Sequence, residues 1–60
     1  MFSCTYQVER IDGDYVYLRQ IGVEAEPKLV ARALLPAEIA EGTYLLYEWL
    51  QYTIIEAPIA

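Results

Sequence analysis

The side chains in this sequence that could carry out covalent or acid–base chemistry are few and poorly matched. The 60 residues include one cysteine, Cys4, one serine, Ser3, and no histidine. A thiol or hydroxyl becomes a strong nucleophile when a neighbouring base removes its proton, and histidine is the usual base. Cys4 lies between Phe2 and Tyr6 in an alternating apolar stretch, so we expect it to be a buried small hydrophobe rather than a nucleophile or a redox sensor.

Three carboxylates, Glu9, Asp12 and Asp14, gather near one predicted turn. They could hold a hard cation or act as an acid and base pair. Their spacing does not fit a calcium-binding loop, and Asp-Gly-Asp is ordinary turn chemistry. A domain of this size offers no evident deep cleft in which one carboxyl group would stay protonated at neutral pH. We therefore expect no metal, no cofactor and no catalytic residue, and we interpret the chain as not being an enzyme.

Aromatic side chains are abundant, with six tyrosines, one tryptophan and one phenylalanine. Tyr, Trp and Arg dominate the hot spots of protein interfaces, although exposed Tyr is also ordinary packing on a sheet. One group follows the outer face of a predicted strand, and a Trp-Leu pair lies near the end of the chain. The candidate interaction surface consists of Tyr15, Tyr17, Arg19, Trp49 and Leu50.

The charge balance argues against a nucleic-acid partner. Four Lys and Arg residues stand against nine Asp and Glu residues, which gives a formal net charge of -5. Binding to phosphate backbones is driven by Lys and Arg that displace counterions, and four scattered cations suit it poorly. The excess of carboxylates has a simpler role, because it keeps a chain that is 57% hydrophobic soluble.

No stretch of the sequence predicts export or membrane insertion. The uninterrupted apolar runs are about five residues long, far below the roughly 20 that a membrane helix needs, and no basic start leads into an apolar stretch of signal length. A secreted domain this small would normally carry paired cysteines. We therefore expect a cytoplasmic protein without a membrane partner.

The length allows one domain. The free energy gained by burying apolar surface and the entropic cost of ordering a chain of this size are each about 90 kcal/mol, so they nearly cancel. No repeat, low-complexity tract or linker interrupts the sequence. We expect residues 1–60 to form a single small domain that is marginally stable or is helped by a partner.

Local patterns predict strands through most of the chain. Residues 2–9 alternate apolar and polar side chains, and residues 15–21 are built of Tyr, Val and Leu, so the Asp-Gly-Asp segment between them predicts a β-hairpin. A surface loop is expected over residues 22–27. Residues 28–35 are predicted to form a third strand, although their alanines and leucines would also tolerate a helix.

The register of the first hairpin follows from keeping apolar residues on one face. A loop of Asp12, Gly13 and Asp14 would achieve this, and it predicts a bulged turn with Gly13 or Asp14 at positive φ. The cross-strand pairs expected from this register are Val8 with Leu18, Gln7 with Arg19, and Glu9 with Tyr17.

Pro36 marks the end of the third strand. It biases Leu35 towards extended geometry and suits the first position of a helix, while Gly42 is a natural stop. Residues 37–41 are therefore expected to form one 3₁₀ or α turn, with Ile39 pointing inward.

Residues 43–55 carry two competing signals. Leu46, Leu50 and Ile54 fall at helical spacing, and Thr43 could cap a helix. The aromatic and β-branched residues of the same stretch favour strands, and the stretch is too long for a single one. We predict two strands joined by a tight turn near Trp49-Leu50, with the last strand ending at Pro58.

Three of these segments together resemble a family of small bacterial proteins, the domain of unknown function 3006 family. The segments are Glu9-Arg10-Ile11-Asp12-Gly13-Asp14-Tyr15, Ala33-Leu34-Leu35-Pro36 and Glu41-Gly42-Thr43. They match the family's acidic-Arg-hydrophobic-acidic-Gly-Asp turn, its central strand running into Leu-Pro, and the acidic-Gly-Asp start of its final hairpin, and the resemblance covers about residues 6–55.

The resemblance implies a small barrel, sometimes appended to larger hydrolase-type proteins, and no catalytic residue. Together with the predicted strands, the expected fold is all-β: a five-stranded SH3-like or OB-like barrel with one short 3₁₀ or α turn before the final hairpin. Thr43 stands where the family usually has Asp, and Trp49-Leu50 stands where its turn carries Asp-Gly or similar. A Trp-Leu pair at a hairpin tip would be unusually exposed, so either the turn is built differently or these side chains meet a partner.

These observations predict a non-catalytic protein-interaction or self-assembly module. It would form a homo-oligomer or bind a protein partner through the outer aromatics, an edge strand or the Trp49-Leu50 region. The alternative is a small-ligand binding domain in which exposed Tyr and Trp faces stack on a neutral glycan.

Overall fold

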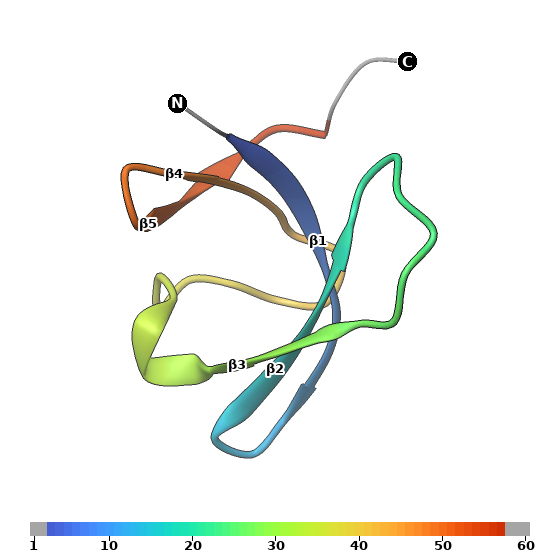
Figure 1. Ribbon diagram of the computed structural model, residues 1–60. Helices are drawn as coiled ribbons and strands as arrows, with labels where there is room; N and C mark the ends of the chain where they lie inside the picture. Colours follow the sequence, from blue (N-terminus) through green and yellow to red (C-terminus); the bar gives the residue numbers. More distant parts are fainter. Residues whose placement is uncertain (1–2, 58–60) are drawn as a thin grey trace.

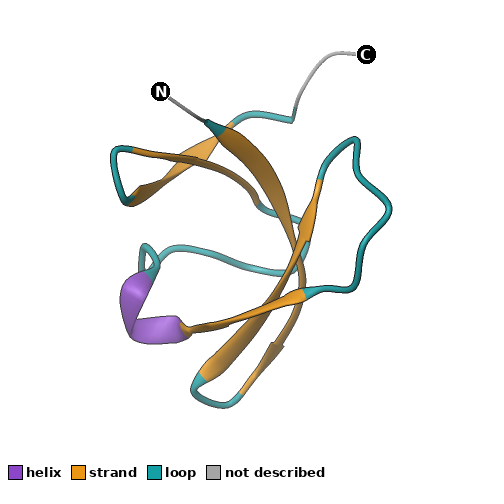
Figure 2. Ribbon diagram, in the orientation of Figure 1, coloured by secondary structure: helices purple, strands orange, loops and turns teal. Residues whose placement is uncertain are grey.

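A computed structural model describes residues 3–57, which form one antiparallel sheet of five strands (Figure 1). The elements are β1 (Cys4–Asp12), β2 (Tyr15–Gln20), β3 (Lys28–Ala31), the 3₁₀ turn η1 (Arg32–Leu34), β4 (Tyr44–Glu48) and β5 (Gln51–Ile55). The strand order β3-β2-β1-β4-β5 places the first strand in the centre and leaves β3 and β5 at the two edges. The expected all-β class is confirmed (Figure 2), but among the described residues the sheet is not closed into a barrel.

The β1–β2 hairpin confirms the predicted pairing away from the turn and corrects it at the turn. Two predicted pairs are present: Val8 with Leu18 and Gln7 with Arg19. The turn, however, holds two residues rather than three, because Asp12 pairs with Tyr15. Gly13 has a positive φ of 60°, as predicted, whereas Asp14 does not, and this combination is typical of a type II′ turn.

The extra residue of this hairpin is a bulge at Glu9 and not part of the loop. The register shifts there, so Arg10 lies opposite Tyr17, and the prediction that Glu9 faces Tyr17 is wrong. The cause is the spacing of the apolar residues, because Val8 points into the core and the next apolar residue of the strand is Ile11. One extra residue resets the alternation, so that Ile11 packs against the core and Arg10 turns outward.

The third strand is shorter than predicted. β3 ends at Ala31, which pairs with Tyr15, the first residue of β2. Because the two strands are antiparallel, β2 offers no further residue with which β3 could pair. The chain then forms η1, in which the Leu35 N–H donates to the Arg32 carbonyl at 3.0 Å. The prediction of a strand over residues 32–34 is therefore wrong, and a helical turn, the alternative left open for this stretch, is present.

The segment after η1 is extended and then turns. Leu35 is extended (φ -114°, ψ 158°), as Pro36 predicts. Residues 37–41 contain hydrogen-bonded turns and no 3₁₀ or α helix, so the 3₁₀ turn precedes Pro36 instead of following it. Ile39 is buried, as predicted.

The final hairpin confirms two strands and excludes the helical alternative. β4 and β5 pair from Tyr44–Ile55 to Glu48–Gln51, with Trp49 and Leu50 forming the turn. Thr43 does not cap a helix, since its Oγ1 accepts the Ala40 N–H at 3.0 Å. The ends predicted for the first and last strands, Phe2 and Pro58, lie outside the described residues.

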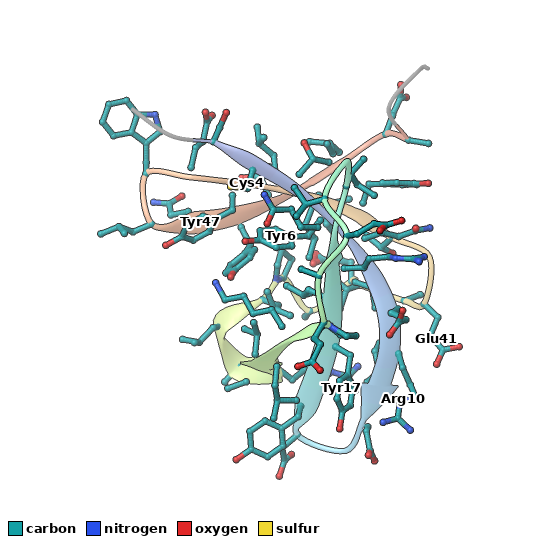
Figure 3. The ribbon with its side chains drawn as sticks, turned by 45° about the vertical axis from the view of Figure 1, so that its right-hand side comes forward. Cys4, Tyr6, Arg10, Tyr17, Glu41 and Tyr47 are labelled. Atoms are coloured by element: carbon teal, nitrogen blue, oxygen red, sulfur yellow. The ribbon has the colours of Figure 1, made fainter. Side chains whose placement is uncertain are left out.

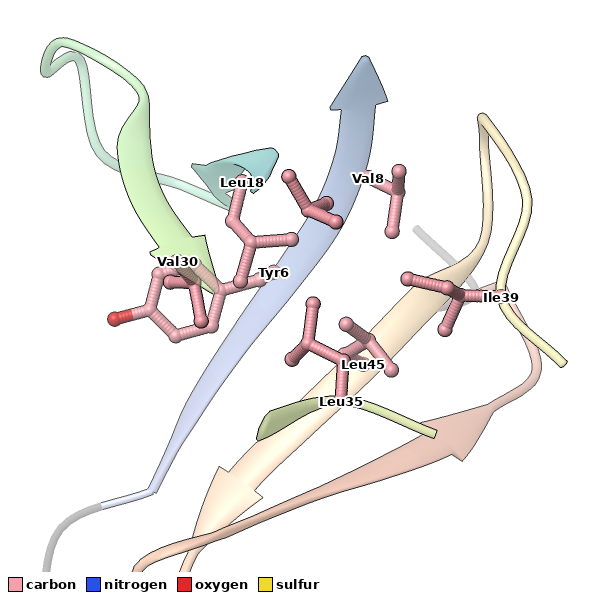
Figure 4. Close-up of a cluster of buried hydrophobic side chains, with 8 residues drawn as sticks. Tyr6, Val8, Leu18, Val30, Leu35, Ile39 and Leu45 are labelled. Carbon is pink, nitrogen blue, oxygen red and sulfur yellow. The ribbon is translucent and has the colours of Figure 1, made fainter. Parts of the chain in front are cut away.

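The core lies between the concave face of the sheet and the segment that connects η1 to β4 (Figure 4). Its buried side chains are Tyr6, Val8, Val16, Leu18, Val30, Leu35, Ile39 and Leu45. The connecting segment is fastened to the central strand, because the Val8 N–H donates to the Thr43 carbonyl and the Val8 carbonyl accepts the Gly42 N–H, both at 2.8 Å. Leu35 and Ile39 are thereby held over the sheet.

We expect this small core to tolerate truncation poorly. Leu45 is 0% exposed, so Leu45→Ala should lower the free energy of unfolding by about 2–5 kcal/mol, a large share of the stability of so small a domain. Leu34, at 70% exposed, supplies the matched control, and Leu34→Ala should change stability by no more than about 0.5 kcal/mol. Urea denaturation followed by far-ultraviolet circular dichroism measures both, and equal effects of the two substitutions would contradict the described core.

Candidate functional site

The five residues predicted to form one interaction surface lie in two places. Tyr15, Tyr17 and Arg19 belong to β2, where they alternate with buried residues and face away from the core. Trp49 and Leu50 form the turn between β4 and β5. The predicted surface is therefore two separate groups in the structure: an outer-face group of Tyr15, Tyr17 and Arg19, and a turn group of Trp49 and Leu50.

One ring of the outer-face group is already in contact with another side chain of the same molecule. The Arg10 guanidinium lies over the Tyr17 ring, 4.4 Å from the ring centroid (Figure 3). Such a cation–π contact at an exposed site contributes about 0.5–1 kcal/mol. Tyr15 remains 52% exposed. The prediction from sequence missed Arg10, because without the bulge at Glu9 its side chain would belong to the inner face.

The turn group combines unusual backbone with unusual exposure. Trp49 and Leu50 have φ values of 54° and 60°, and two consecutive positive values are typical of a type I′ turn. Such turns favour Asn and Gly, because a Cβ atom strains the left-handed conformation. The two side chains are also 67% and 87% exposed. Neither strain nor exposure is offset by burial within the described chain.

A cleft of about 380 Å³ lies beside this turn, between the two edges of the sheet. It is lined by residues of β3, η1, β4, the β4–β5 turn and β5: Lys28, Leu29, Val30, Ala31, Leu34, Tyr47, Leu50 and Tyr52. Of the five predicted surface residues, Leu50 is the one that lines it. No carboxylate is among these lining residues, although the chain has nine.

Three tyrosines form a tyrosine cluster: Tyr47 and Tyr52, which line the cleft, and Tyr6, which packs beside Tyr52. The ring centroids of Tyr47 and Tyr52 are 4.6 Å apart with an interplanar angle of 43°, and those of Tyr6 and Tyr52 are 6.1 Å apart. The Lys28 Nζ lies 5.6 Å from the Tyr6 centroid and 5.4 Å from the Tyr47 centroid. A residue of edge strand β3 thus reaches side chains of β1 and β4, and Figure 3 shows Tyr6 and Tyr47 on the same side of the molecule.

The prediction from sequence missed Lys28, Tyr47 and Tyr52 as site residues. A signal was present, because Tyr47 follows the inward Leu45 by two positions and a two-residue turn at Trp49-Leu50 places it directly opposite Tyr52. No comparable local signal places Lys28, since its contacts cross from one edge of the sheet to the other.

Electrostatics keep Lys28 protonated. Burial by itself lowers the pKa of the Lys28 ammonium, but hydrogen bonding to the Tyr52 side chain and electrostatic interactions with Tyr52, Tyr6 and Tyr47 outweigh this, and the net pKa is raised above 10.5. Burial likewise raises the pKa of Tyr6 above 10.0, an effect that the neighbouring Lys28 partly offsets. At neutral pH the cleft therefore presents one ammonium group.

The remaining candidates for chemistry lie apart from the cleft lining. Cys4 is a half-buried free thiol that packs against the core, so it is less buried than expected. Glu9, Asp12 and Asp14 are all exposed. Within residues 3–57, no group of three or more His, Cys, Asp or Glu side chains is placed to hold a metal ion.

Comparison with known proteins does not assign this geometry to a family. A scan against protein-family models, a search of curated proteins and a search of solved structures each gave no match for this chain. The resemblance to the domain of unknown function 3006 family therefore remains a prediction. Over the part of the chain that the structure describes, no helix has the length and apolar character needed to cross a membrane.

Relieving the strain of the turn should stabilise the protein. The double substitution Trp49→Asn with Leu50→Gly supplies the residues that a type I′ turn favours, so we expect the free energy of unfolding to rise by about 1–2 kcal/mol in urea denaturation. The control Trp49→Ala with Leu50→Ala removes the same side chains without relieving the positive φ values and should give no such gain. A stabilisation of equal size in both variants would show that exposure of the side chains, and not backbone strain, is the cause.

Stability should fall at alkaline pH. The pKa values of Tyr6 and Lys28 are both raised on folding, so the folded protein retains protons that the unfolded chain releases, and this contribution is present below about pH 10 and lost as pH rises through the folded values. We expect the urea midpoint to decrease between about pH 8 and about pH 11. Tyr6→Phe should make the decrease shallower, and Tyr15→Phe, outside the tyrosine cluster, is the matched control for the loss of a hydroxyl group. A midpoint that is constant over this range would contradict the prediction.

Proposed function

We propose that this protein is a non-catalytic interaction module that binds further copies of itself or a protein partner through the Trp49-Leu50 turn and the adjoining cleft. The observation that carries this proposal is the turn. Two large apolar side chains occupy left-handed backbone positions and remain 67% and 87% exposed. Trp is also among the residues most enriched in interface hot spots.

The energetic argument is that these two residues do not serve the fold. A non-glycine residue in the left-handed region costs about 1–3 kcal/mol, and exposed Trp and Leu gain nothing from the core. An Asn-Gly turn would join β4 and β5 with less strain. Contact with a partner would remove both side chains from water, which supplies a favourable term that the isolated domain lacks.

We further propose that the curled sheet belongs with the small SH3-like or OB-like barrels, as the family resemblance implies. The support is that the two edges approach each other through side chains, since Lys28 of β3 interacts with Tyr47 of β4 and Tyr52 of β5. The free thiol of Cys4 supports a cytoplasmic location, where thiols stay reduced.

Binding of a small neutral glycan is the second candidate function. It is favoured by the Tyr47 and Tyr52 rings that line the cleft and by the exposed Trp49 beside it. Aromatic faces of this kind stack on sugar rings and on bases alike. The interaction role ranks first because it accounts for Leu50, the most exposed of these residues, as well as for Trp49.

Self-association is the direct test of the proposed module. Sedimentation across a concentration series should show the wild-type protein forming oligomers, and Trp49→Asn with Leu50→Gly should remove them while the domain stays folded. Tyr15→Ser, in the outer-face group, is the matched control and should leave association unchanged. The same comparison applies to proteins captured from the source cell on the immobilised domain.

Three outcomes would count against this assignment. A wild-type protein that stays monomeric and captures no Trp49-dependent partner would overturn the interaction role. Association that depends on Tyr15 and not on the turn would move the interface to the outer face of β2. A shift of Trp49 fluorescence with a neutral glycan, without self-association, would support the second candidate function in its place.

A further inference from the structure

We propose that the cleft between β3 and β5 binds the Val23–Glu26 segment of a second copy of this chain, with a glutamate of that segment paired to Lys28. This inference rests on the proposed interaction function and names the partner of the same site. It is carried by the chemistry of the cleft and by the chemistry of an exposed loop elsewhere in the molecule.

The cleft is lined by a cation although the protein as a whole is acidic. The chain holds nine carboxylates and four cations, yet the cleft lining contains Lys28 and no carboxylate. Lys28 lies over the tyrosine cluster. The walls of the cleft include the exposed Leu34 and Leu50. Such a site is complementary to a segment that offers a carboxylate next to an apolar side chain.

The loop between β2 and β3 provides such a segment. Residues 23–26 read Val-Glu-Ala-Glu, and all four are exposed. Val23, the largest apolar side chain among them, is 49% exposed. They have no secondary structure, and apolar and acidic residues alternate along them, as in a strand that pairs with a sheet edge. Both β3 and β5 have an edge that is unpaired among the described residues, so the backbone of an incoming segment would find donors and acceptors.

The segment belongs to a second copy because of where the loop lies. It precedes Lys28 at the start of β3, whereas η1, which supplies Leu34, follows the end of that strand. Figure 1 shows the loop on the side of the molecule opposite to η1 and the β4–β5 turn. Apart from its end at Lys28, the loop therefore lies away from the cleft walls of its own chain, and its residues are exposed to a neighbour.

Each copy then offers one cleft and one loop. Two copies can satisfy both contacts reciprocally in a closed dimer, and a contact that does not close in this way would produce a ring or a chain of copies. Acidic proteins repel one another, so local charge pairing of this kind favours an association between two molecules of net charge -5.

Reversal of charge tests the pairing directly. In sedimentation across a concentration series, Lys28→Glu and the double substitution Glu24→Lys with Glu26→Lys should each weaken wild-type self-association by at least about tenfold. An equimolar mixture of the two variants should restore it, because each cleft then meets a loop of opposite charge. Circular dichroism checks that each variant is folded.

Two controls change the same charges elsewhere. Arg19→Glu lies on the outer face of β2, and Glu38→Lys with Glu41→Lys lies on an exposed segment before β4. Neither should show the loss of about tenfold, because each changes only the general repulsion between copies. The loop variant also reduces the net negative charge and hence the general repulsion, so weaker association in that variant cannot arise from net charge.

The outcomes separate this inference from the proposed function. Association that the turn variant removes and charge reversal does not would leave the interaction role standing and overturn the loop–cleft pairing. A mixture of the two variants that fails to associate, or a wild-type protein that is monomeric and captures a different Trp49-dependent partner, would overturn it as well. Association that charge reversal removes and the turn variant does not would support the pairing and contradict the role of the turn.

Discussion

The central strand β1 must present apolar side chains to one small core along its whole length, and the rest of the structure depends on this constraint. The spacing of its apolar residues changes between Val8 and Ile11, so the strand meets the constraint only with a bulge at Glu9. The bulge keeps Ile11 against the core and sends Arg10 outward onto Tyr17. Val8 then makes the two backbone hydrogen bonds that link the connecting segment to β1, and this segment holds Leu35 and Ile39 over the sheet.

The candidate site forms because the two edge strands of the sheet, β3 and β5, approach each other without pairing. A five-stranded sheet with a core this thin has little to bury at its edges, and β3 and β5 meet through side chains and not through a backbone ladder. The tyrosine cluster suits this position because each ring has an apolar body and a polar hydroxyl that tolerates contact with water. Lys28 spans the same region, with its Nζ over the rings of Tyr6 and Tyr47. The resulting cleft is apolar in its walls and cationic at one point, in an otherwise acidic protein.

The β4–β5 turn and the β2–β3 loop are the two places where local structure and local chemistry disagree. At the turn, apolar residues occupy backbone positions that favour Asn and Gly, and at the loop exposed apolar residues alternate with exposed glutamates. Folding explains neither feature, since both side-chain groups lie outside the core. The association that we propose would account for both, because the turn adjoins the cleft and the loop carries the charge that the cleft lining lacks.

The sequence by itself determined the local features. Alternation predicted the strands, Pro36 predicted an extended Leu35, and the restricted length of a strand predicted the turn at Trp49-Leu50, because each depends on residues within a few positions of one another. Only the tertiary structure decided where β3 ends, since that depends on the length of β2, and where the bulge lies, since that depends on which face meets the core. It also decided the cleft: Lys28 reaches Tyr47 and Tyr52 across two edges of the sheet, and no local pattern records which distant edges a twisted sheet brings together.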